Sequence, residues 1–559
     1  MRREAVALRR TGFFLLCLAI AAGLLALSWT VLSGGGWTVW EALILLGIAG
    51  NLPWLAISAA NGIAGLLILL LAKRPAAYVT PQLDAAAPPP PKGLTAIAVC
   101  IRNEDMAGVL PPLERLLDGL EATGAGDRFV LWFLSDTQDA AHAAAEEAAL
   151  VAFADARAGR PIAVRWRRRV ENTGFKAGNV MEFLDESAGD AEFFLCLDAD
   201  SEMTATAVLR LVTAMEADPR LAILQQLIVG RPASAAFPRL FQFGMRAAMR
   251  TWATGQAWWQ ADEGPYWGHN AVIRIAPFRE HGKLERLPDG SMILSHDQVE
   301  AVRLQAAGWK VRCLPEEDGS MEGNPPAMPE FIRRDQRWAA GNMQYFALLR
   351  LPGMTAMGRW QLLQAILLFF GAPLWLLVLV AALLNVLTGG ADGTPIGALV
   401  LLLLLAQAAY AGSKLPGYAE ALIHPAVAAR YGGRRQFAKG AGLELLFTQL
   451  FEPVRVLNQA MFLVLLAFGV KAGWAPQNRA DRGVTWGDAA RLLWLHTLVG
   501  VVITILAFSA SWVAGLLMLP WTLSMVLAIP FCVVTSSPRA SAWLRERRLC
   551  ATPEELAAP

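Results

Sequence analysis

The chain has 559 residues, of which 55% are hydrophobic and only 17% charged, whereas an ordinary soluble protein carries about 25% charged residues. This composition excludes a soluble enzyme and indicates a membrane protein. The 49 Lys and Arg residues nearly balance the 47 Asp and Glu residues, so the net charge of +2 points to no nucleic acid or other polyanionic partner. The six cysteines match neither a zinc site nor a disulfide framework.

The first predicted elements are two membrane-spanning helices. The apolar run Gly12–Leu32 follows a basic stretch and is long enough to cross a bilayer, which takes about 20 residues. A second run, Leu52–Leu71, follows soon after, which favours a transmembrane hairpin over a cleaved signal peptide. We assign residues 1–75 to this hairpin.

A water-soluble domain is predicted over residues 76–360, after the Pro-rich linker Ala85–Pro91. Within it, apolar strand-like runs alternate with helix-like segments such as Pro111–Ala122. The strand-like runs are Leu94–Ile101, Phe129–Leu134, Ala163–Trp166 and Phe193–Leu197. The alternation predicts an α/β domain with a largely parallel sheet, in which a ligand binds outside the carboxyl ends of the strands.

Three of these four runs are followed at once by carboxylates. The polar segments are Arg102-Asn103-Glu104-Asp105, Ser135-Asp136 and Asp198-Ala199-Asp200. Convergent negative charge is costly without a cation, and Asp198 and Asp200 offer the oxygen ligands that Mg²⁺ or Mn²⁺ prefers, with a diphosphate filling the other positions. A lone pair of this kind is more often a solvated turn, but its place in the array favours a metal site.

Basic residues lie between the second and fourth strand-like runs. The segment Gly174–Asn179 precedes a helix-like segment, and Lys176 would supply a charge to phosphate while the glycines let backbone N–H groups approach it. A capped turn is the plainer interpretation. The arginine run Arg165–Arg169 is predicted to be a solvated or headgroup-facing strand edge.

Later candidates are an acid and an aromatic residue. Asp297 opens a helix predicted to run to Ala307, where it is either an N-cap or a general base, which contributes typically 10²- to 10⁴-fold to a rate. His269 lacks metal-ligand spacing and is predicted to form hydrogen bonds. Trp338, next to Arg337, suits a sugar ring stacking on the indole, although such a pair is also an ordinary interfacial anchor.

Residues 361–559 are predicted to form a C-terminal transmembrane region. Its apolar spans are Leu362–Leu387, Ile396–Ala411, Leu492–Ala510 and Leu516–Thr535. The run Leu443–Val470 contains Glu444, Glu452 and Arg455, each of which would cost roughly 2.5 to 3.5 kcal/mol at a bilayer centre. We therefore expect an interfacial or re-entrant helix there, which leaves six spans.

The orientation follows from the basic residues near the spans. The loops Ser33–Trp37 and Gly389–Thr394 contain none, whereas the two tails and the soluble domain are rich in them. Because short loops rich in Lys and Arg stay cytoplasmic, we expect both termini and the soluble domain in the cytoplasm.

Taken together, the motifs resemble a family 2 glycosyltransferase of the processive membrane type, and most closely the subgroup that builds osmoregulated periplasmic glucans. The segments that carry the resemblance, besides those at the strand ends, are Tyr266-Trp267-Gly268-His269-Asn270-Ala271, Leu294-Ser295-His296-Asp297, Arg337-Trp338 and Ala372-Pro373-Leu374-Trp375. The chain departs from the wider family's QxxRW signature, since Arg334 stands where Gln is expected. The resemblance implies a GT-A glycosyltransferase domain between transmembrane helices in the bacterial inner (cytoplasmic) membrane.

The resemblance also implies a donor, a cofactor and roles for individual residues. The donor would be UDP-glucose, the cofactor Mg²⁺ (or Mn²⁺) and the acceptor a growing glucan. The nucleotide-sugar contacts would come from Asn103, Glu104, Asp136, Lys176, Asn179 and Asp198, the metal contacts from Asp198 and Asp200, the general base from Asp297, and the acceptor contacts from His269, Asn270, Arg337 and Trp338. The segment Lys471–Gly487 takes the place of a gating loop.

An inverting, processive transfer with export would give a β-linked glucan, and only the subgroup resemblance implies the 1,2-linkage. Periplasmic glucan-processing proteins would then be partners. Two alternatives stay open: a cellulose- or hyaluronan-type polysaccharide synthase, and a non-catalytic membrane scaffold that senses UDP-glucose.

Overall fold

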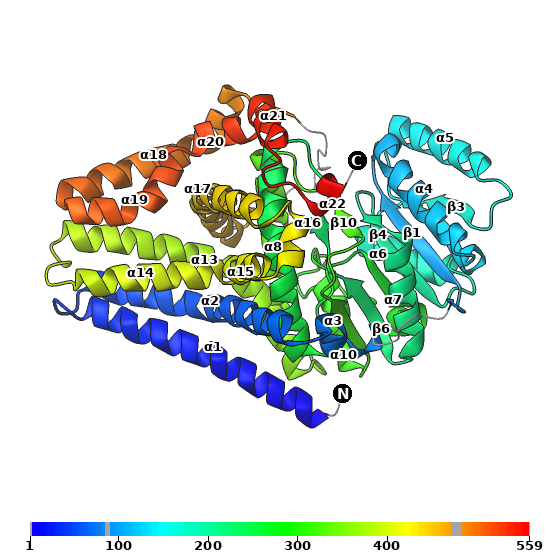
Figure 1. The fold of residues 1–559 in the computed structure, drawn as a ribbon, viewed down its shortest axis with the longest axis horizontal. Coiled ribbons are helices and arrows are strands. Elements are labelled where there is room, and N and C mark those ends of the chain that lie inside the picture. The colour runs from blue at the N-terminus through cyan, green and yellow to red at the C-terminus, as the bar shows by residue number, and fades with distance from the viewer. Residues whose placement is uncertain (1–2, 84–89, 471–481, 558–559) are drawn as a thin grey trace.

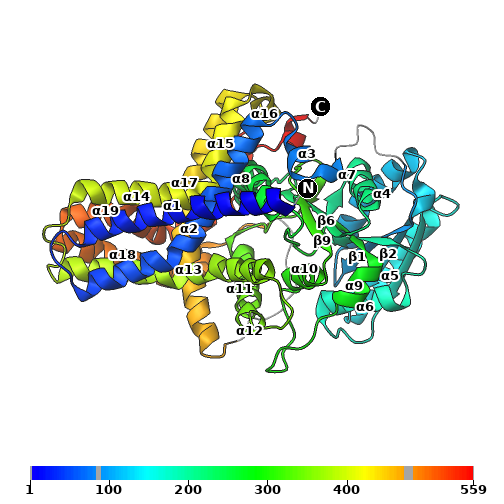
Figure 2. The same cartoon turned by 90° about the horizontal axis from the view of Figure 1, so that it is seen from below.

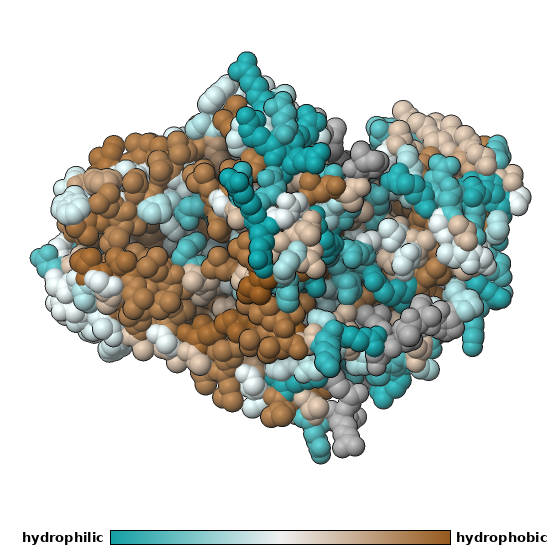
Figure 3. All heavy atoms as spheres, viewed as in Figure 1, coloured by the Kyte–Doolittle hydropathy of each residue, from teal (hydrophilic) through white to brown (hydrophobic). Residues whose placement is uncertain are grey.

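The computed structural model describes residues 3–83, 90–470 and 482–557 and has two parts (Figure 1). A layered α/β domain lies at one end and a bundle of long helices at the other. Figure 3 shows apolar side chains gathered over the bundle and polar ones over the α/β domain. This division matches the change in composition along the sequence.

The α/β domain is built on a seven-stranded sheet of order β3-β2-β1-β4-β8-β6-β9. Its strands are β1 (Thr95–Ile101), β2 (Phe129–Ser135), β3 (Ala163–Arg168), β4 (Phe193–Asp198), β6 (Leu221–Gln226), β8 (Ala271–Arg274) and β9 (Lys310–Leu314). The four predicted strands all form and lie parallel, whereas β8 pairs antiparallel with both of its neighbours. A second sheet contains β5 (Glu202–Met203), β10 (Ser320–Glu322) and β7 (Val229–Gly230).

Helices cover both faces of the larger sheet because the buried residues of each strand alternate between two apolar clusters. Ile97 and Val99 of β1 pack with Leu117, whereas Ala96 and Ala98 pack with Phe183. The helices of this domain are α4 (Met106–Ala122), α5 (Ala140–Ala156), α6 (Phe175–Glu186), α7 (Ala205–Ala217), α8 (Ala236–Gln260), α9 (Ile275–His281), α10 (Asp297–Ala306), α11 (Met328–Met343) and α12 (Tyr345–Leu348).

One predicted helix begins earlier than expected. The segment predicted from Pro111 belongs to α4, which starts at Met106 because Asp105 caps it, accepting a hydrogen bond of 3.0 Å from the Ala107 N–H. The cap places the carboxyl end of β1 directly beside the start of this helix.

The bundle contains most of the predicted spans. Within the described residues, six helices are long and apolar enough to cross a membrane. The helices of this part are α1 (Arg3–Leu32), α2 (Val39–Leu71), α13 (Ala356–Leu387), α14 (Ile396–Tyr410), α15 (Lys414–Ile423), α17 (Arg434–Ala467), α18 (Trp486–Ala510) and α19 (Trp512–Val526). Figure 1 shows both chain ends on the side of the α/β domain, and the α1–α2 and α13–α14 loops at the far end. The chain is therefore a multi-pass membrane protein.

Helix α17 holds the segment predicted to be interfacial. It meets the length and composition of a span, but Figures 1 and 2 show it running across the bundle, between the spans and the α/β domain. Its charges are paired inside the protein: Glu444 binds Lys414, and Arg455 lies 2.7 Å from Glu452. The paired charges and the crosswise course are compatible with an interfacial helix, which stays a prediction.

The predicted last span, Leu516–Thr535, is wrong as a single helix. It is divided into α19 and α20 (Ala528–Thr535), which are bent by 53° relative to each other. Pro530 explains the break, because proline has no N–H to donate and its ring clashes with the carbonyl four residues earlier, that of Val526. A broken span or a re-entrant loop fits this shape.

Short helices complete the chain: α3 (Pro75–Val79), α16 (Pro425–Arg430), α21 (Pro538–Glu546) and α22 (Pro553–Ala557). Most of the predicted linker and the greater part of the predicted gating loop, residues 471–481, lie outside the described residues. From the end of that loop, Arg482 reaches Glu330 at the start of α11 with a nitrogen–oxygen distance of 2.6 Å.

Candidate active site

The candidate site lies at the carboxyl ends of β1, β2 and β4. Ile101 pairs with Ser135 in the register, and Cys100 pairs with Asp198. The three polar segments that follow these strands therefore meet at one edge of the sheet, as the sequence pattern predicted. This edge is where open α/β sheets bind ligands.

Asp136 lies at one side of this edge and is clamped by an arginine. Arg169 donates two hydrogen bonds to its carboxylate, of 2.7 and 2.8 Å, and both side chains are buried. The predicted solvated edge is therefore wrong for Arg169, because β3 lies next to β2 and brings the residue after its end onto Asp136. A bidentate pair of this kind fixes the orientation of the carboxylate.

Asn103 lies beside Asp136 in a strained conformation. Its φ is 55°, its N–H donates to the Thr137 hydroxyl at 2.8 Å, and its buried side-chain carbonyl has no hydrogen-bond partner among the described residues. An orphaned buried acceptor beside a cleft is well suited to a ligand donor. Glu104 follows it, half-buried at the same edge.

Lys176 is the cation at the centre of the site. Its ammonium group pairs with the Asp198 carboxylate and donates a hydrogen bond of 2.8 Å to the Gly268 carbonyl. Burial opposes protonation of this amine, but the neighbouring Asp198 carboxylate outweighs burial, so the pKa of Lys176 is raised. Lys176 is therefore positively charged at any physiological pH.

Asn179 does not face the same space as Lys176. Its amide nitrogen donates to the Leu134 carbonyl at 3.1 Å, and its amide oxygen accepts from Arg167 at 2.9 Å. The side chain is buried and holds α6 against β2. Both polar groups of Asn179 are engaged in positioning α6, and its predicted nucleotide contact stays a prediction.

The residues after Gly268 form the next wall of the site. His269 lies 3.3 Å from Glu322 and 3.2 Å from the Ser201 hydroxyl. Burial opposes protonation of His269, but the Asp198 and Glu322 carboxylates outweigh it and raise the pKa of His269 to about 9. The imidazole is thus a second cation near Asp198.

Asn270 has a different place from the one predicted. It is fully buried, with a φ of 50°, and its amide nitrogen donates to the Ser320 hydroxyl at 3.0 Å and the Met321 carbonyl at 3.2 Å. These bonds join β8 to β10. The Asn270 side chain thus anchors the strand that carries Glu322, and its predicted acceptor contact stays a prediction.

Asp297 opens α10 and lies next to Gly268. A β-carbon added to Gly268 would lie in ordinary contact with Asp297, 3.8 Å from its carboxylate, and it is the φ of 91° that favours glycine at this position. Burial raises the pKa of Asp297, and the nearby Glu300 carboxylate raises it further. Asp297 and Lys176 thus lie on either side of Gly268.

The donor chemistry of Asp198 and Asp200 fits a divalent cation. Mg²⁺ is commonly held by one or two carboxylates together with substrate phosphates. Within the described ranges, no group of three or more His, Cys, Asp or Glu side chains would hold a metal alone. Two carboxylates, of which Asp198 pairs with Lys176, therefore suit an ion that a diphosphate helps to bind.

Trp338 and its neighbours on α11 form the membrane side of the site. The indole is 47% exposed, and the Arg334 guanidinium lies 4.6 Å from its ring centroid. Arg337 is half-buried next to it. Arg334 stands where the wider family has glutamine. Its guanidinium packs against the Trp338 ring, and its charge interacts favourably with the carboxylates of Glu322 and Asp200.

Sequence reasoning missed Arg169, Glu322 and Arg334 as parts of this site. Glu322 belongs to β10, far along the chain from Asp198, and no local motif marks it. For Arg169 the signal was its position one residue past a strand end, as for Asp136. Arg334 stood out in the sequence as a departure from the QxxRW signature. Its contact with Trp338 could be recognised only once both residues were seen on one face of α11.

Comparison with known proteins places the α/β domain in a family of enzymes. Residues 96–282 match the model of Glycosyl transferase family 2, and residues 193–413 match Glycosyl transferase family group 2. A mannosyltransferase from Pyrobaculum calidifontis in complex with GDP-Man and Mn²⁺ is 16% identical, with a TM-score of 0.40 over 66% of this chain and 98% of that one. The family matches and the sheet define the class: a GT-A glycosyltransferase domain flanked by membrane helices.

The particular family follows from the curated relatives. The chain is 31% identical over 574 residues to glucans biosynthesis glucosyltransferase H of Xylella fastidiosa, covering 99% of this chain and 89% of the relative. It is 32% identical over 578 residues to the Caulobacter vibrioides protein of the same name, covering 99% and 86%. The chain belongs to the glucosyltransferase H family, the glycosyltransferases of glucan biosynthesis, and so uses a nucleotide-sugar donor and a glycan acceptor.

Proposed function

We propose that this protein transfers glucose from UDP-glucose to a growing β-1,2-linked glucan and exports the product through its own helices. The catalytic domain would face the cytosol at the bacterial inner membrane, with both termini on the same side. The observation that carries the proposal is the position of Asp297 across Gly268 from Lys176, beside the Asp198 carboxylate. Asp297 as the base for the acceptor hydroxyl and Lys176 as the cation for the leaving diphosphate suit an in-line displacement at the sugar between them.

Each end of the donor has residues of matching chemistry. Asp136, oriented by Arg169, would accept a hydrogen bond from uracil, and the unpaired Asn103 carbonyl would accept another from the nucleoside. Lys176 would bind the diphosphate. Asp198 and Asp200 would hold Mg²⁺ or Mn²⁺, which when bound supplies positive charge against the diphosphate.

The reaction would be an inverting displacement. Asp297 removes the proton from an acceptor hydroxyl, and the acceptor oxygen forms a bond to the anomeric carbon of glucose. The bond from that carbon to the diphosphate breaks, and its electron pair leaves with UDP, whose charge Lys176 stabilises. Because the donor linkage is α, the new linkage is β.

The experiment that tests this function supplies membranes containing the protein with radiolabelled UDP-glucose and Mg²⁺, and digests the product with linkage-specific glucanases. A 1,2-linked glucan is expected. Incorporation from another sugar nucleotide, or a 1,4-linked product, would instead support a cellulose- or hyaluronan-type synthase. Binding of UDP-glucose without any glucan would support the sensing scaffold.

Trp338 is proposed to stack on the acceptor glucose. Replacing Trp338 with Ala is expected to raise KM for a glucan acceptor by about fivefold, since ring stacking of this kind contributes on the order of 1 kcal/mol. KM for UDP-glucose should change little. Steady-state kinetics with varied acceptor and fixed donor measure this, and Trp338→Phe, which keeps an aromatic face, should lie near the wild type. Equal increases for donor and acceptor would contradict the assignment.

The route for export is proposed to start at α11 and continue into the bundle. Asp335 is adjacent to Arg334 and accepts a hydrogen bond of 3.3 Å from Gln459, and Gln459 in turn lies 3.4 Å from Arg455. Arg455 pairs with Glu452, which lines a cavity of about 190 Å³ between α13, α14, α17 and α19. This line of polar groups connects the candidate site with the interior of the spans.

The cavity itself has the chemistry of a sugar-binding channel. Trp375 and Trp521 lie on its wall with ring centroids 6.3 Å apart, and Gln407 and Tyr410 provide polar groups beside them. Aromatic faces with hydrogen-bonding groups between them suit a glucan chain.

Replacing Trp375 with Ala is therefore expected to shorten the exported glucan by at least twofold while initial glucose transfer changes less than twofold, because stacking of about 1 kcal/mol would be lost only after the chain has entered the helices. Sizing of the radiolabelled product measures this. Trp494→Ala, on the exposed surface of α18, is the matched control. An unchanged length distribution would argue against this route.

A further inference from the structure

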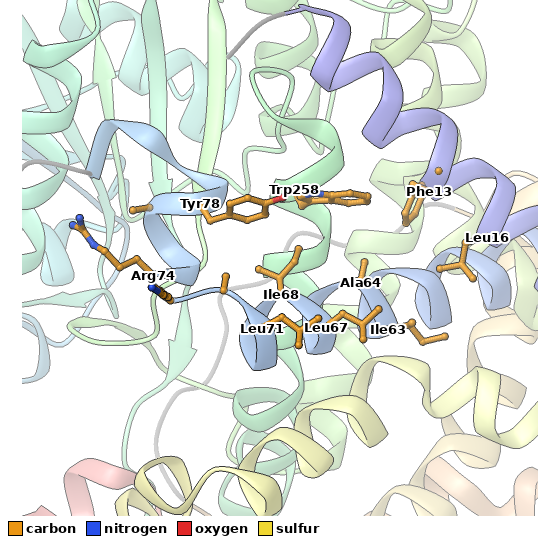
Figure 4. A pocket seen from close by; sticks show the side chains of 14 residues that line it. Phe13, Leu16, Ile63, Ala64, Leu67, Ile68, Leu71, Arg74, Tyr78 and Trp258 are labelled. Carbon is orange, nitrogen blue, oxygen red and sulfur yellow. The ribbon is translucent and has the colours of Figure 1, made fainter.

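A large cavity lies outside the candidate site, at the junction of the bundle and the α/β domain. It has a volume of about 740 Å³ and is lined by α1, α2, α3 and α8 (Figure 4). One wall is the row Ile63, Leu67 and Leu71 of α2, and the other is formed by Phe13 with Tyr78 and Trp258. We call this cavity the α1–α2 groove.

The α1–α2 groove continues into a smaller cavity of opposite character. The second cavity has a volume of about 320 Å³, and Arg74 and Ala77 line both. Its other side chains include Arg210 and Arg250, with Glu316 as the acidic one. An apolar groove therefore lies next to a cluster of arginines, which we call the arginine pocket.

The arginine pocket keeps an excess of positive charge. The Arg210 Nε is buried and has no hydrogen-bond partner in the described part of the chain, although its terminal nitrogen donates to Gln226 at 2.9 Å. Arg250 lies 3.0 Å from Glu420. Burial raises the pKa of Glu316 in spite of Arg210 and Arg250, which weakens the only acidic group in the lining.

Further cations lie along the groove itself. Lys73 lines it at the end of α2, and the Arg9 guanidinium lies 4.9 Å from the Tyr78 ring centroid and 5.9 Å from that of Trp258. Basic groups just beyond an apolar surface of two spans are typical of protein sites for anionic lipids.

We propose that the α1–α2 groove and the arginine pocket together form a binding site for one anionic phospholipid. The acyl chains would lie along Leu67 and Leu71, and the headgroup phosphate would lie between Arg74 and Arg210. Neither group of residues takes part in the donor and acceptor contacts proposed above, so this site stands or fails independently of the glucan chemistry.

The site also touches the catalytic domain. Trp258 of the groove is followed by Trp259, which stacks on Phe13 at 4.3 Å, and Arg10 pairs with Glu263 at 2.6 Å. These contacts join α1 to the segment that leads into Tyr266 and Gly268. A bound phospholipid would thus fix the position of α1 against the domain.

The test uses the purified full chain, delipidated in detergent and titrated with single lipids while native mass spectrometry counts the adducts. One phosphatidylglycerol per chain is expected, bound at least tenfold more tightly than phosphatidylcholine of the same acyl chains, because each basic residue near a headgroup contributes about fivefold in affinity. Glycerol 1-phosphate, which has the charge without the chains, should not bind at the same concentrations. Equal binding of the two phospholipids would overturn the proposal, and so would tight binding of glycerol 1-phosphate, which would make this a site for a free phosphate.

Two variants separate the two halves of the site. Ala64→Trp fills the groove and should abolish the tight adduct, whereas Leu46→Trp, on the exposed surface of the same helix, should leave it intact. Arg74→Gln should reduce the preference for phosphatidylglycerol by about fivefold, and Arg491→Gln, an exposed cation on α18, should not. Wild-type lipid binding by Ala64→Trp would overturn the site, and the thermal midpoint of each variant with phosphatidylcholine alone reports whether it is folded.

Discussion

Replacing Asp297 with Asn should reduce glucosyl transfer by about 10²- to 10⁴-fold, the contribution typical of a general base, while UDP binds almost as before. The amide keeps the size of the carboxyl and its place beside Gly268, but it has no basic oxygen to take the proton of the acceptor hydroxyl. Transfer rates with radiolabelled UDP-glucose and calorimetry with UDP measure the two effects. Asp155→Asn, an exposed carboxylate on α5, is the matched control and should keep full activity.

The pH profile gives an independent signature of Asp297. Its pKa is raised by burial, so the protonated, inactive form persists to a higher pH than for an ordinary Asp near 3.9. Activity should therefore fall as the pH drops through this raised pKa, above the range of an exposed carboxyl.

The same shift has a consequence for stability. A raised carboxyl pKa means that the folded state favours the neutral form, so ionisation costs stability as the pH rises through the folded pKa. Asp297→Asn removes that cost and should be at least as stable as the wild type at neutral pH. A variant with lost activity and a lowered thermal midpoint would contradict a role confined to the base.

The four strands that carry the site were predictable because each is a short apolar run followed directly by polar residues. Strand β8 has only four residues and β9 contains two cations, so neither stands out from its surroundings. Their order next to β4, and the antiparallel course of β8, depend on contacts between distant segments. Local pattern therefore predicts the parallel half of the sheet and not the other half.

The site divides in the same way. Asp136, Lys176, Asp198 and Asp297 lie at ends of strands and helices, where sequence position alone indicates the direction of a ligand. For Asn179 and Asn270 the family motif was present, but the structure uses their amides inside the fold. The residue type did not reveal this, because the partners, two backbone carbonyls and the side chains of Arg167 and Ser320, belong to other elements.

The bundle shows the limit of composition as a guide to spans. Apolar length and composition count α17 as a candidate span, whereas its three interrupting charges favour an interfacial helix, so the interfacial assignment stays a prediction. The same method missed the break between α19 and α20, since a single Pro530 barely changes the apolar character of the segment. A proline three residues into a helix matters through geometry and not through hydropathy.

Replacing Lys176 with Met should reduce the rate of transfer by about 10²- to 10³-fold, because a fixed positive charge at a leaving group contributes on the scale of an oxyanion-hole donor. Met keeps the length of the side chain but can neither stabilise the departing diphosphate nor pair with Asp198. Lys176 also lowers the pKa of Asp297, so the acid limb of the remaining activity should move to a higher pH in this variant. Lys283→Met, whose side chain is 56% exposed and pairs with Asp185, is the matched control. A Lys176→Met variant with the full rate, or with an unchanged pH profile, would mean that the diphosphate lies elsewhere. The Lys176 ammonium group lies between Asp198 and the Gly268 carbonyl, so a cation that contacts the leaving group there must also influence the pKa of Asp297.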